Sequence, residues 1–267
     1  MHEGVIDRAV RDILRAKKTI VLTGAGISVE SGIPDFRSQQ GLWSTYDPEE
    51  YATIGAFMAH PEKVWVMLKE MMELIIRAKP NPAHRGLASL EEMGLVSSVI
   101  TQNVDGLHQA AGSKKVIEFH GTHRTLSCLR CGLKRESSMF SVRELPPKCP
   151  QCGRLLKPDV IFFGEPIPWE AYTEAYSEAQ SCDLALVIGT SAAVFPAADI
   201  PRLAKGNGAT VAEMNVEETS LTRQVSDYTV LGPCATTISE IVQRAKAQGG
   251  SLGYENHDLG AGVQNHR

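Results

Sequence analysis

The chain has 267 residues, 43% of them hydrophobic, which is enough for one large core or for a large domain with a smaller satellite. Its 27 Lys and Arg residues against 31 Asp and Glu residues give a formal net charge of −4, which disfavours a broad nucleic-acid or anionic-membrane surface. No apolar signal segment precedes residue 19, and the apolar stretch 184–198 is too short to span a bilayer. We therefore expect a soluble cytoplasmic protein whose cysteines stay reduced unless a metal binds them.

Helical and strand patterns alternate along the chain. The segment 3–17 repeats apolar residues at helical spacing and leads into an apolar, β-branched run at 19–23. Further runs, expected to form strands, lie at 96–101, 116–119, 160–163, 184–188, 210–214 and 228–231, and helices are expected at 83–93, 169–180 and 235–248. This alternation predicts an α/β fold, a Rossmann-like doubly wound parallel sheet whose ligands bind beyond the carboxyl ends of the strands.

Two segments, 38–79 and 122–157, do not fit the alternation. We predict that they form a smaller domain, the first as a helical insertion and the second as a zinc ribbon. The large domain then consists of 1–37, 80–121 and 158–248. The glycine-rich polar stretch 249–267 is expected to be a flexible tail.

Two CxxC pairs, separated by seventeen residues, give the sharpest local signal: Cys128, Cys131, Cys149 and Cys152. Four thiolates at this spacing favour one tetrahedral Zn²⁺ per chain, structural because no coordination position is left for water. Two disulfides or redox dithiols are the alternatives, and a reducing compartment disfavours both. We expect Cys182 and Cys234 to be small core residues.

The strand at 19–23 runs into Gly24-Ala25-Gly26, which outlines a dinucleotide-binding turn at which backbone N–H groups approach a phosphate. Val29 stands where the usual fingerprint has its third glycine, and this weakens a dehydrogenase-type interpretation. Polar groups also follow two later strands, in Thr101-Gln102-Asn103-Val104-Asp105 and at His120. A single histidine is often only a hydrogen-bonded structural residue, but His120 ends a strand at the expected ligand-binding edge and is therefore a candidate base.

Together these motifs resemble the sirtuin family of NAD-dependent protein deacylases, from about Lys18 to Arg244. The resemblance rests on Gly24-Ala25-Gly26-Ile27-Ser28, Gly32-Ile33-Pro34-Asp35-Phe36-Arg37, the Thr101–Asp105 segment, Phe119-His120-Gly121, the paired CxxC, Phe163-Gly164-Glu165, Gly189-Thr190-Ser191 and Asn215. The family's own pattern is GAGxS, so Val29 is no departure from it.

The resemblance implies NAD as co-substrate, with His120 as catalytic base and Asn103 as a second catalytic residue. The implied NAD contacts are Gly24, Ala25, Gly26, Ser28, Ile33, Asp35, Phe36, Arg37, Gln102, Asn103, Asp105, Gly189, Thr190, Ser191, Asn215, Cys234 and Ala235. Within this set, Ser28 would line the pyrophosphate, Asn103 and Asp105 would hold the nicotinamide carboxamide, and Phe36 would shield the reacting ribose.

The reaction implied by the resemblance transfers the acyl group of an acyl-lysine to ADP-ribose and releases nicotinamide, free lysine and 2′-O-acyl-ADP-ribose. Acyl-lysine peptides would bind as an added strand between two walls. The implied substrate contacts are Val160, Phe162, Phe163, Gly164, Glu165 and Val194, although Val160 and Phe162 are equally compatible with sheet core. Leu68 and Met71 replace the Tyr and Arg of sirtuins that prefer acidic acyl groups, so we expect acetyl or longer neutral acyl groups.

Two other functions fit part of the sequence. A protein mono-ADP-ribosyltransferase would use the same NAD site with a protein nucleophile as acceptor. A non-enzymatic NAD-sensing or zinc-ribbon module would leave the convergence of His120, Asn103 and Asp105 unexplained. The segment 122–157 is rich in Lys and Arg, so weak contact with nucleic acid or acidic partners stays open, whereas no membrane partner is expected.

Overall fold

A computed structural model describes residues 2–137 and 145–252. Its main sheet has six parallel strands in the order β3-β2-β1-β7-β8-β9. These strands are β1 (Thr19–Thr23), β2 (Ser98–Thr101), β3 (Val116–Glu118), β7 (Leu184–Ile188), β8 (Thr210–Asn215) and β9 (Tyr228–Leu231). The order reverses direction at β1, which confirms the predicted doubly wound sheet.

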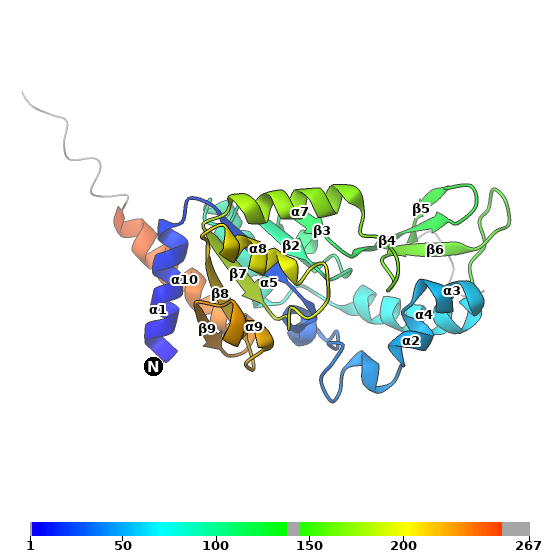
Figure 1. Ribbon diagram of the computed structural model, residues 1–267, viewed down its shortest axis with the longest axis horizontal. Helices are drawn as coiled ribbons and strands as arrows, with labels where there is room; N and C mark the ends of the chain where they lie inside the picture. Colours follow the sequence, from blue (N-terminus) through cyan, green and yellow to red (C-terminus); the bar gives the residue numbers. More distant parts are fainter. Residues whose placement is uncertain (1, 138–144, 253–267) are drawn as a thin grey trace, which may run out of the picture.

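Helices cover both faces of this sheet (Figure 1). On one face α1 (His2–Arg15), α5 (Pro82–Glu92) and α10 (Cys234–Leu252) pack on side chains such as Val21, Val99 and Leu186. On the other, α7 (Trp169–Ser181) and α8 (Asp199–Gly206) pack on the alternate positions, among them Ile20 and Val187. Successive side chains of a strand point to opposite faces of the sheet. Because helices cover both faces here, the strands need apolar residues at nearly every position, which is the pattern seen in the sequence.

A second, three-stranded antiparallel sheet has the order β5-β4-β6 and contains β4 (Gly121–Cys128), β5 (Lys134–Glu136) and β6 (Leu156–Val160). The short helix η2 (Leu42–Ser44) and helices α2 (Pro48–Tyr51), α3 (Ile54–Ala59) and α4 (Pro61–Arg77) precede it in the chain. Their apolar side chains and those of the small sheet form a separate core cluster. Trp65 lies fully buried in this cluster, and its indole N–H donates to the Leu156 carbonyl at 3.2 Å, which ties α4 to β6. Figure 1 shows this small sheet and α2–α4 together at one end of the molecule.

The expectation that 160–163 forms a strand of the parallel sheet is wrong. Val160 ends β6, whose register pairs it with Gly121 in the small antiparallel sheet, and Phe162 is buried in the small core cluster. A short apolar run looks the same in either sheet, so its pattern alone could not decide between them.

The helix α10 continues to Leu252, past the start of the tail predicted at 249, and 253–267 lie outside the described residues. The rest of the chain adds the short helices η1 (Ala25–Ser31), α6 (Leu107–Ala110) and α9 (Ser220–Gln224). No helix in the described ranges combines the length and hydropathy that a bilayer crossing requires.

Candidate active site at the strand ends

A row of hydrogen bonds connects the carboxyl ends of four strands of the main sheet. The Nδ1 atom of His120, just after β3, lies 3.2 Å from the carbonyl oxygen of Gln102, which follows β2. The side-chain amide of Gln102 donates to the hydroxyl of Thr190 at 2.9 Å, beyond β7. Asn215, which ends β8, donates its amide to the Thr190 carbonyl at 3.2 Å. Four predicted site residues are thus brought together at the edge where doubly wound sheets bind ligands.

The contact with Gln102 decides the tautomer of His120. A carbonyl oxygen only accepts, so Nδ1 carries the proton and Nε2 keeps its lone pair. No hydrogen bond to Nε2 occurs within the described residues. Burial lowers the pKa of His120, partly offset by the bond to the Gln102 carbonyl, and the neutral imidazole is therefore the form at neutral pH. An unpaired Nε2 on a neutral ring is what a general base needs.

The glycines after β1 serve close packing against the end of β7. The Gly26 N–H donates to the Gly189 carbonyl at 2.8 Å, and the Gly24 N–H donates to the Ile188 carbonyl at 3.2 Å. A Cβ at Gly24 or Gly26 would lie 2.6 Å or 2.7 Å from the nearest atom of the opposing loop, and Gly189 adopts a φ of +60°. These two N–H groups are therefore satisfied within the chain, and contact between this turn and a phosphate stays a prediction. Ala25 and Ser191 lie half-buried beside this crossing.

Ser28, Asn103 and Asp105 form one buried polar cluster. The Ser28 hydroxyl donates to an Asp105 carboxylate oxygen at 2.7 Å, and the Asn103 amide donates to the Ser28 oxygen and to the Gly24 carbonyl, both at 3.1 Å. Asp105 also accepts the Leu107 N–H at 2.9 Å, which fixes the start of α6. The structure therefore places Ser28 with the residues expected to hold the nicotinamide, whereas the sequence had placed it on the pyrophosphate.

Three further buried residues, which belong to none of the predicted site motifs, extend this cluster. Asn81 caps α5 and donates to the Ile27 carbonyl at 2.7 Å, and the ring of His84 lies 3.5 Å from the Ser28 hydroxyl oxygen. The Nε2 atom of His108 contacts the Thr23 hydroxyl at 2.9 Å. Burial lowers the pKa of His84 to about 4 and that of His108 to about 3. A sequence signal exists only for Asn81, because Asn-Pro is a helix-start pattern.

The loop after η1 holds the remaining predicted residues of the first motif. One carboxylate oxygen of Asp35 accepts the backbone N–H groups of Arg37 and Ser38 at 2.9 and 2.8 Å, so it supports its own loop. The ring of Phe36 is half-buried against Trp43, with ring centroids 5.1 Å apart, and the Arg37 side chain is exposed. Ile33 is buried in a small apolar cluster with Ile75, Leu107 and, at its edge, Met71.

The start of α10 is occupied from within the chain. The Ala235 N–H donates to a carboxylate oxygen of Glu30 at 2.8 Å. Cys234 is buried, and burial raises the pKa of its thiol to about 12. This thiol is neutral at neutral pH, and its surroundings are those expected of a core residue.

The predicted substrate residues lie on two separated walls. On the first, Phe163 is 44% exposed, while its backbone N–H and carbonyl pair with Ala52 and Ile54 at 2.8 and 3.0 Å. On the second, Val194 is half-buried, and the neighbouring Phe195 is 64% exposed.

The side chain of Glu165 turns inward. It accepts the Phe162 N–H at 2.8 Å and lies 3.0 Å from the Lys157 ammonium group. Phe162 is buried with Phe57, at a ring-centroid separation of 5.3 Å, so of the two interpretations left open the core interpretation describes its position.

The four predicted zinc ligands converge at the end of the small sheet. Their Sγ atoms all lie within 4.8 Å of one another, with separations of 3.5, 3.6 and 3.7 Å between three of the pairs. Tetrahedral thiolates around Zn²⁺, at a Zn–S distance of about 2.3 Å, are about 3.8 Å apart. No disulfide joins them, and Gly132 and Gly153 adopt positive φ values of +71° and +69° in the two turns. This donor set fits one structural zinc ion.

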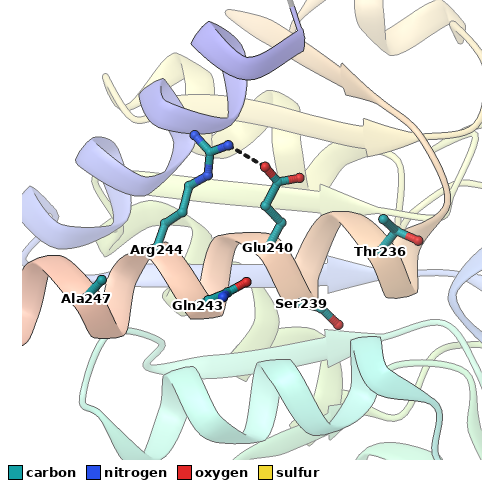
Figure 2. A pocket seen from close by; sticks show the side chains of 6 residues that line it. All are labelled: Thr236, Ser239, Glu240, Gln243, Arg244 and Ala247. Atoms are coloured by element: carbon teal, nitrogen blue, oxygen red, sulfur yellow. Dashed lines mark hydrogen bonds and ion pairs between the residues drawn. The ribbon is translucent and has the colours of Figure 1, made fainter.

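A pocket of about 640 Å³ lies elsewhere, along α10 (Figure 2). Figure 2 shows Glu240 and Arg244, one turn apart on α10, joined to each other, and Arg244 also bonds Asp7 of α1. The lining residues are Thr236, Ser239, Glu240, Gln243, Arg244 and Ala247. None of them belongs to the hydrogen-bonded row at the strand ends, so this pocket is not the candidate active site.

Comparison with known proteins identifies the family of the chain. The model of the Sir2 family matches residues 24–196. A relative from Thermococcus kodakarensis, named NAD-dependent protein deacylase, is 47% identical over 91% of this chain and 96% of its own length. The crystal structure of a Sir2 homolog–NAD complex superposes with a TM-score of 0.85 at 41% identity, covering 91% of this chain and 94% of that one.

A second solved structure, a Sir2 mutant with a deacetylated p53 peptide and 3′-O-acetyl-ADP-ribose, superposes with a TM-score of 0.84. It is 36% identical and covers 92% of this chain and 98% of its own. The family model covers more than half of the chain, and the alignment with the Thermococcus kodakarensis relative covers 91% of it. The chain therefore belongs to the Sir2 family, the sirtuins.

Proposed function

We propose that this protein is an NAD-dependent protein lysine deacylase that consumes an acyl-lysine, NAD and one water and yields free lysine, nicotinamide and 2′-O-acyl-ADP-ribose. The observation that carries the proposal is His120, a neutral imidazole beside the hydrogen-bonded strand ends whose Nε2 has no partner among the residues that the structure describes. Membership of the Sir2 family and the deacylase name of a relative 47% identical to this chain support it.

NAD, when bound, supplies a ribose carbon that nicotinamide leaves and a ribose hydroxyl that takes up the acyl group. Asn103 and Asp105 suit the N–H groups of the nicotinamide carboxamide, because the carboxylate accepts and the Oδ1 of Asn103 has no partner within the described residues. In our proposal Gln102 orients the adjoining ribose, and the Nε2 of His120 takes a ribose hydroxyl proton. Phe36 excludes water from this end of the site.

Acyl-lysine peptides would bind as a strand between the two walls. The backbone groups of Gly164 and Ala193 make no hydrogen bond within the described part of the chain, so one backbone partner is free on each wall. Phe163 cannot pair with a peptide in this way, because Ala52 and Ile54 already occupy its backbone. Pairing through backbone gives affinity with little choice among flanking side chains.

The side chains of two residues on α4 bear on which acyl groups the site would accept. Leu68 is buried and Met71 packs at the edge of the cluster that contains Ile33, so neither position offers a group that binds a carboxylate. We propose that acetyl and longer neutral acyl groups are better substrates than succinyl or malonyl groups.

Mass spectrometry of acetyl-lysine and succinyl-lysine peptides incubated with NAD tests both points. Wild type should release nicotinamide, free lysine peptide and acetyl-ADP-ribose in equal amounts, and faster from the acetyl peptide. The His120→Ala variant should be inactive, while His60→Ala, the same change at an exposed histidine, should behave as wild type. Nicotinamide release with the acetyl group retained and ADP-ribose attached to protein would show a transferase and refute the deacylase.

A further inference from the structure

A buried ammonium group lies behind the first wall of the proposed peptide site. Lys157, on β6, is only 7% exposed. Its Nζ donates to the carbonyls of Pro158 at 3.1 Å and Val160 at 2.8 Å, and lies 3.0 Å from a carboxylate oxygen of Glu165. All three N–H groups are therefore used. Removing an ammonium group from water costs free energy unless it is fully paired. Lys157 and its three partners therefore keep one another in fixed positions.

These contacts fix the turn from Phe162 to Glu165. The Glu165 N–H donates to the Phe162 carbonyl at 3.0 Å, and Gly164, at the third position of the turn, adopts a φ of +88°. The carboxylate oxygen that faces Lys157 also accepts the Phe162 N–H at 2.8 Å. Lys157 also lies 5.0 Å from the centre of the Phe162 ring. One cation thus braces both ends of the turn.

The turn adjoins both the helical insertion and the proposed catalytic base. Phe163 pairs with the backbone at Ala52 and Ile54, and the Ile161 N–H donates to the His120 carbonyl at 2.9 Å. Gly164, whose backbone is unpaired within the described residues, projects from this braced segment. Any displacement of the segment would move the backbone partner offered to the peptide.

We infer that Lys157 is a positioning residue for the peptide substrate, acting through Glu165, an inference that rests on the proposed function. This inference also gives Glu165 a supporting role in place of a substrate contact. The resemblance implied a substrate contact, whereas its carboxylate is engaged with Lys157 and the Phe162 backbone. The pair holds the wall in the conformation that presents Gly164, and neither side chain needs to touch the peptide.

Steady-state kinetics of Lys157→Met tests this role, because Met keeps the apolar stem and removes the charge. We expect the peptide KM to rise about tenfold while the NAD KM is unchanged, with partial recovery in Lys157→Arg. Lys134→Met is the matched control, since it removes the ion pair between the exposed Lys134 of β5 and Asp159 of β6 and should leave both constants as in wild type.

The milder Glu165→Gln variant guards against misfolding of Lys157→Met and should raise the peptide KM in the same direction. In a double-mutant cycle, Lys157→Met and Glu165→Ala should be less than additive. Additive effects would mean that Glu165 contacts the peptide itself and would overturn the inference. So would an unchanged peptide KM in Lys157→Met, or an equal rise in both KM values.

Amide hydrogen exchange at 161–165 needs no substrate and separates this inference from the deacylase proposal. Exchange should accelerate in Lys157→Met and stay unchanged in Lys134→Met. Wild type without deacylase activity would refute the proposed function alone. Unchanged exchange at the turn would refute the bracing by Lys157 whatever the activity.

Discussion

The burial of His120 determines the protonation state of its imidazole ring. Burial is the main cause of its lowered pKa, so at pH 6.5, where a free histidine is half protonated, the neutral form of this ring predominates. We predict that kcat/KM for the peptide falls on the acid side with an apparent pKa below 6.5. The pH–rate profile measures this value, and an acid limb above pH 6.5 would contradict the assignment of His120 as the base.

The two histidines beneath the site act on stability instead. In the folded chain the pKa is about 4 for His84 and about 3 for His108, whereas both titrate near 6.5 when unfolded. As pH falls below 6.5 the unfolded state therefore binds protons that the folded state does not. The free energy of unfolding should decrease by roughly 1 kcal/mol per histidine for each pH unit.

Urea unfolding between pH 7 and 5 measures this loss, and the slope in the His108→Gln variant should be smaller by the contribution of one histidine, roughly 1 kcal/mol per pH unit. A stability that is flat over this range would mean that these histidines are protonated in the folded protein.

At the scale of elements, the crossing of the β1 and β7 loops depends on the absence of side chains. A Cβ at Gly189 would lie 2.4 Å from the Ile27 nitrogen, and the φ there is +60°. Gly189→Ala should therefore lower the free energy of unfolding by about 3 kcal/mol or more. Gly208→Ala is the control, because its φ of +91° is also strained but the space around it is open, and it should cost about 1–2 kcal/mol. Equal costs in denaturant unfolding would show that the close approach is unimportant.

The zinc cluster belongs to the same scale. The Cys128→Ser variant should lose the bound metal and destabilise the small sheet, since four thiolates close the turns at its end. Elemental analysis should find about one zinc per wild-type chain, and chelation should reproduce the effect of the variant. Cys182→Ala, which removes a thiol outside the cluster, should keep the zinc. Full metal content in Cys128→Ser would contradict this ligand set.

For the whole molecule, the sequence predicted what depends on local pattern. The six strands of the main sheet, the helices α1, α5, α7 and α10 and the four converging cysteines were recognisable because each follows from a short spacing or period, whereas α8 was not expected. His84, His108 and Lys157 were not, because their burial depends on which segments the fold brings together. The run 160–163 was assigned to the wrong sheet for the same reason. The division into a large and a small domain, with its boundaries, stays a prediction.

The glycine crossing also bears on the thermodynamics of binding. Gly24 and Gly26 are already hydrogen-bonded to the β7 end before any ligand arrives, so this floor of the site has little conformational entropy left to lose. Ligand fragments that reach only this floor should bind with a small ordering cost. Calorimetry of such fragments measures this cost, and a large unfavourable binding entropy would show that the crossing is not preformed.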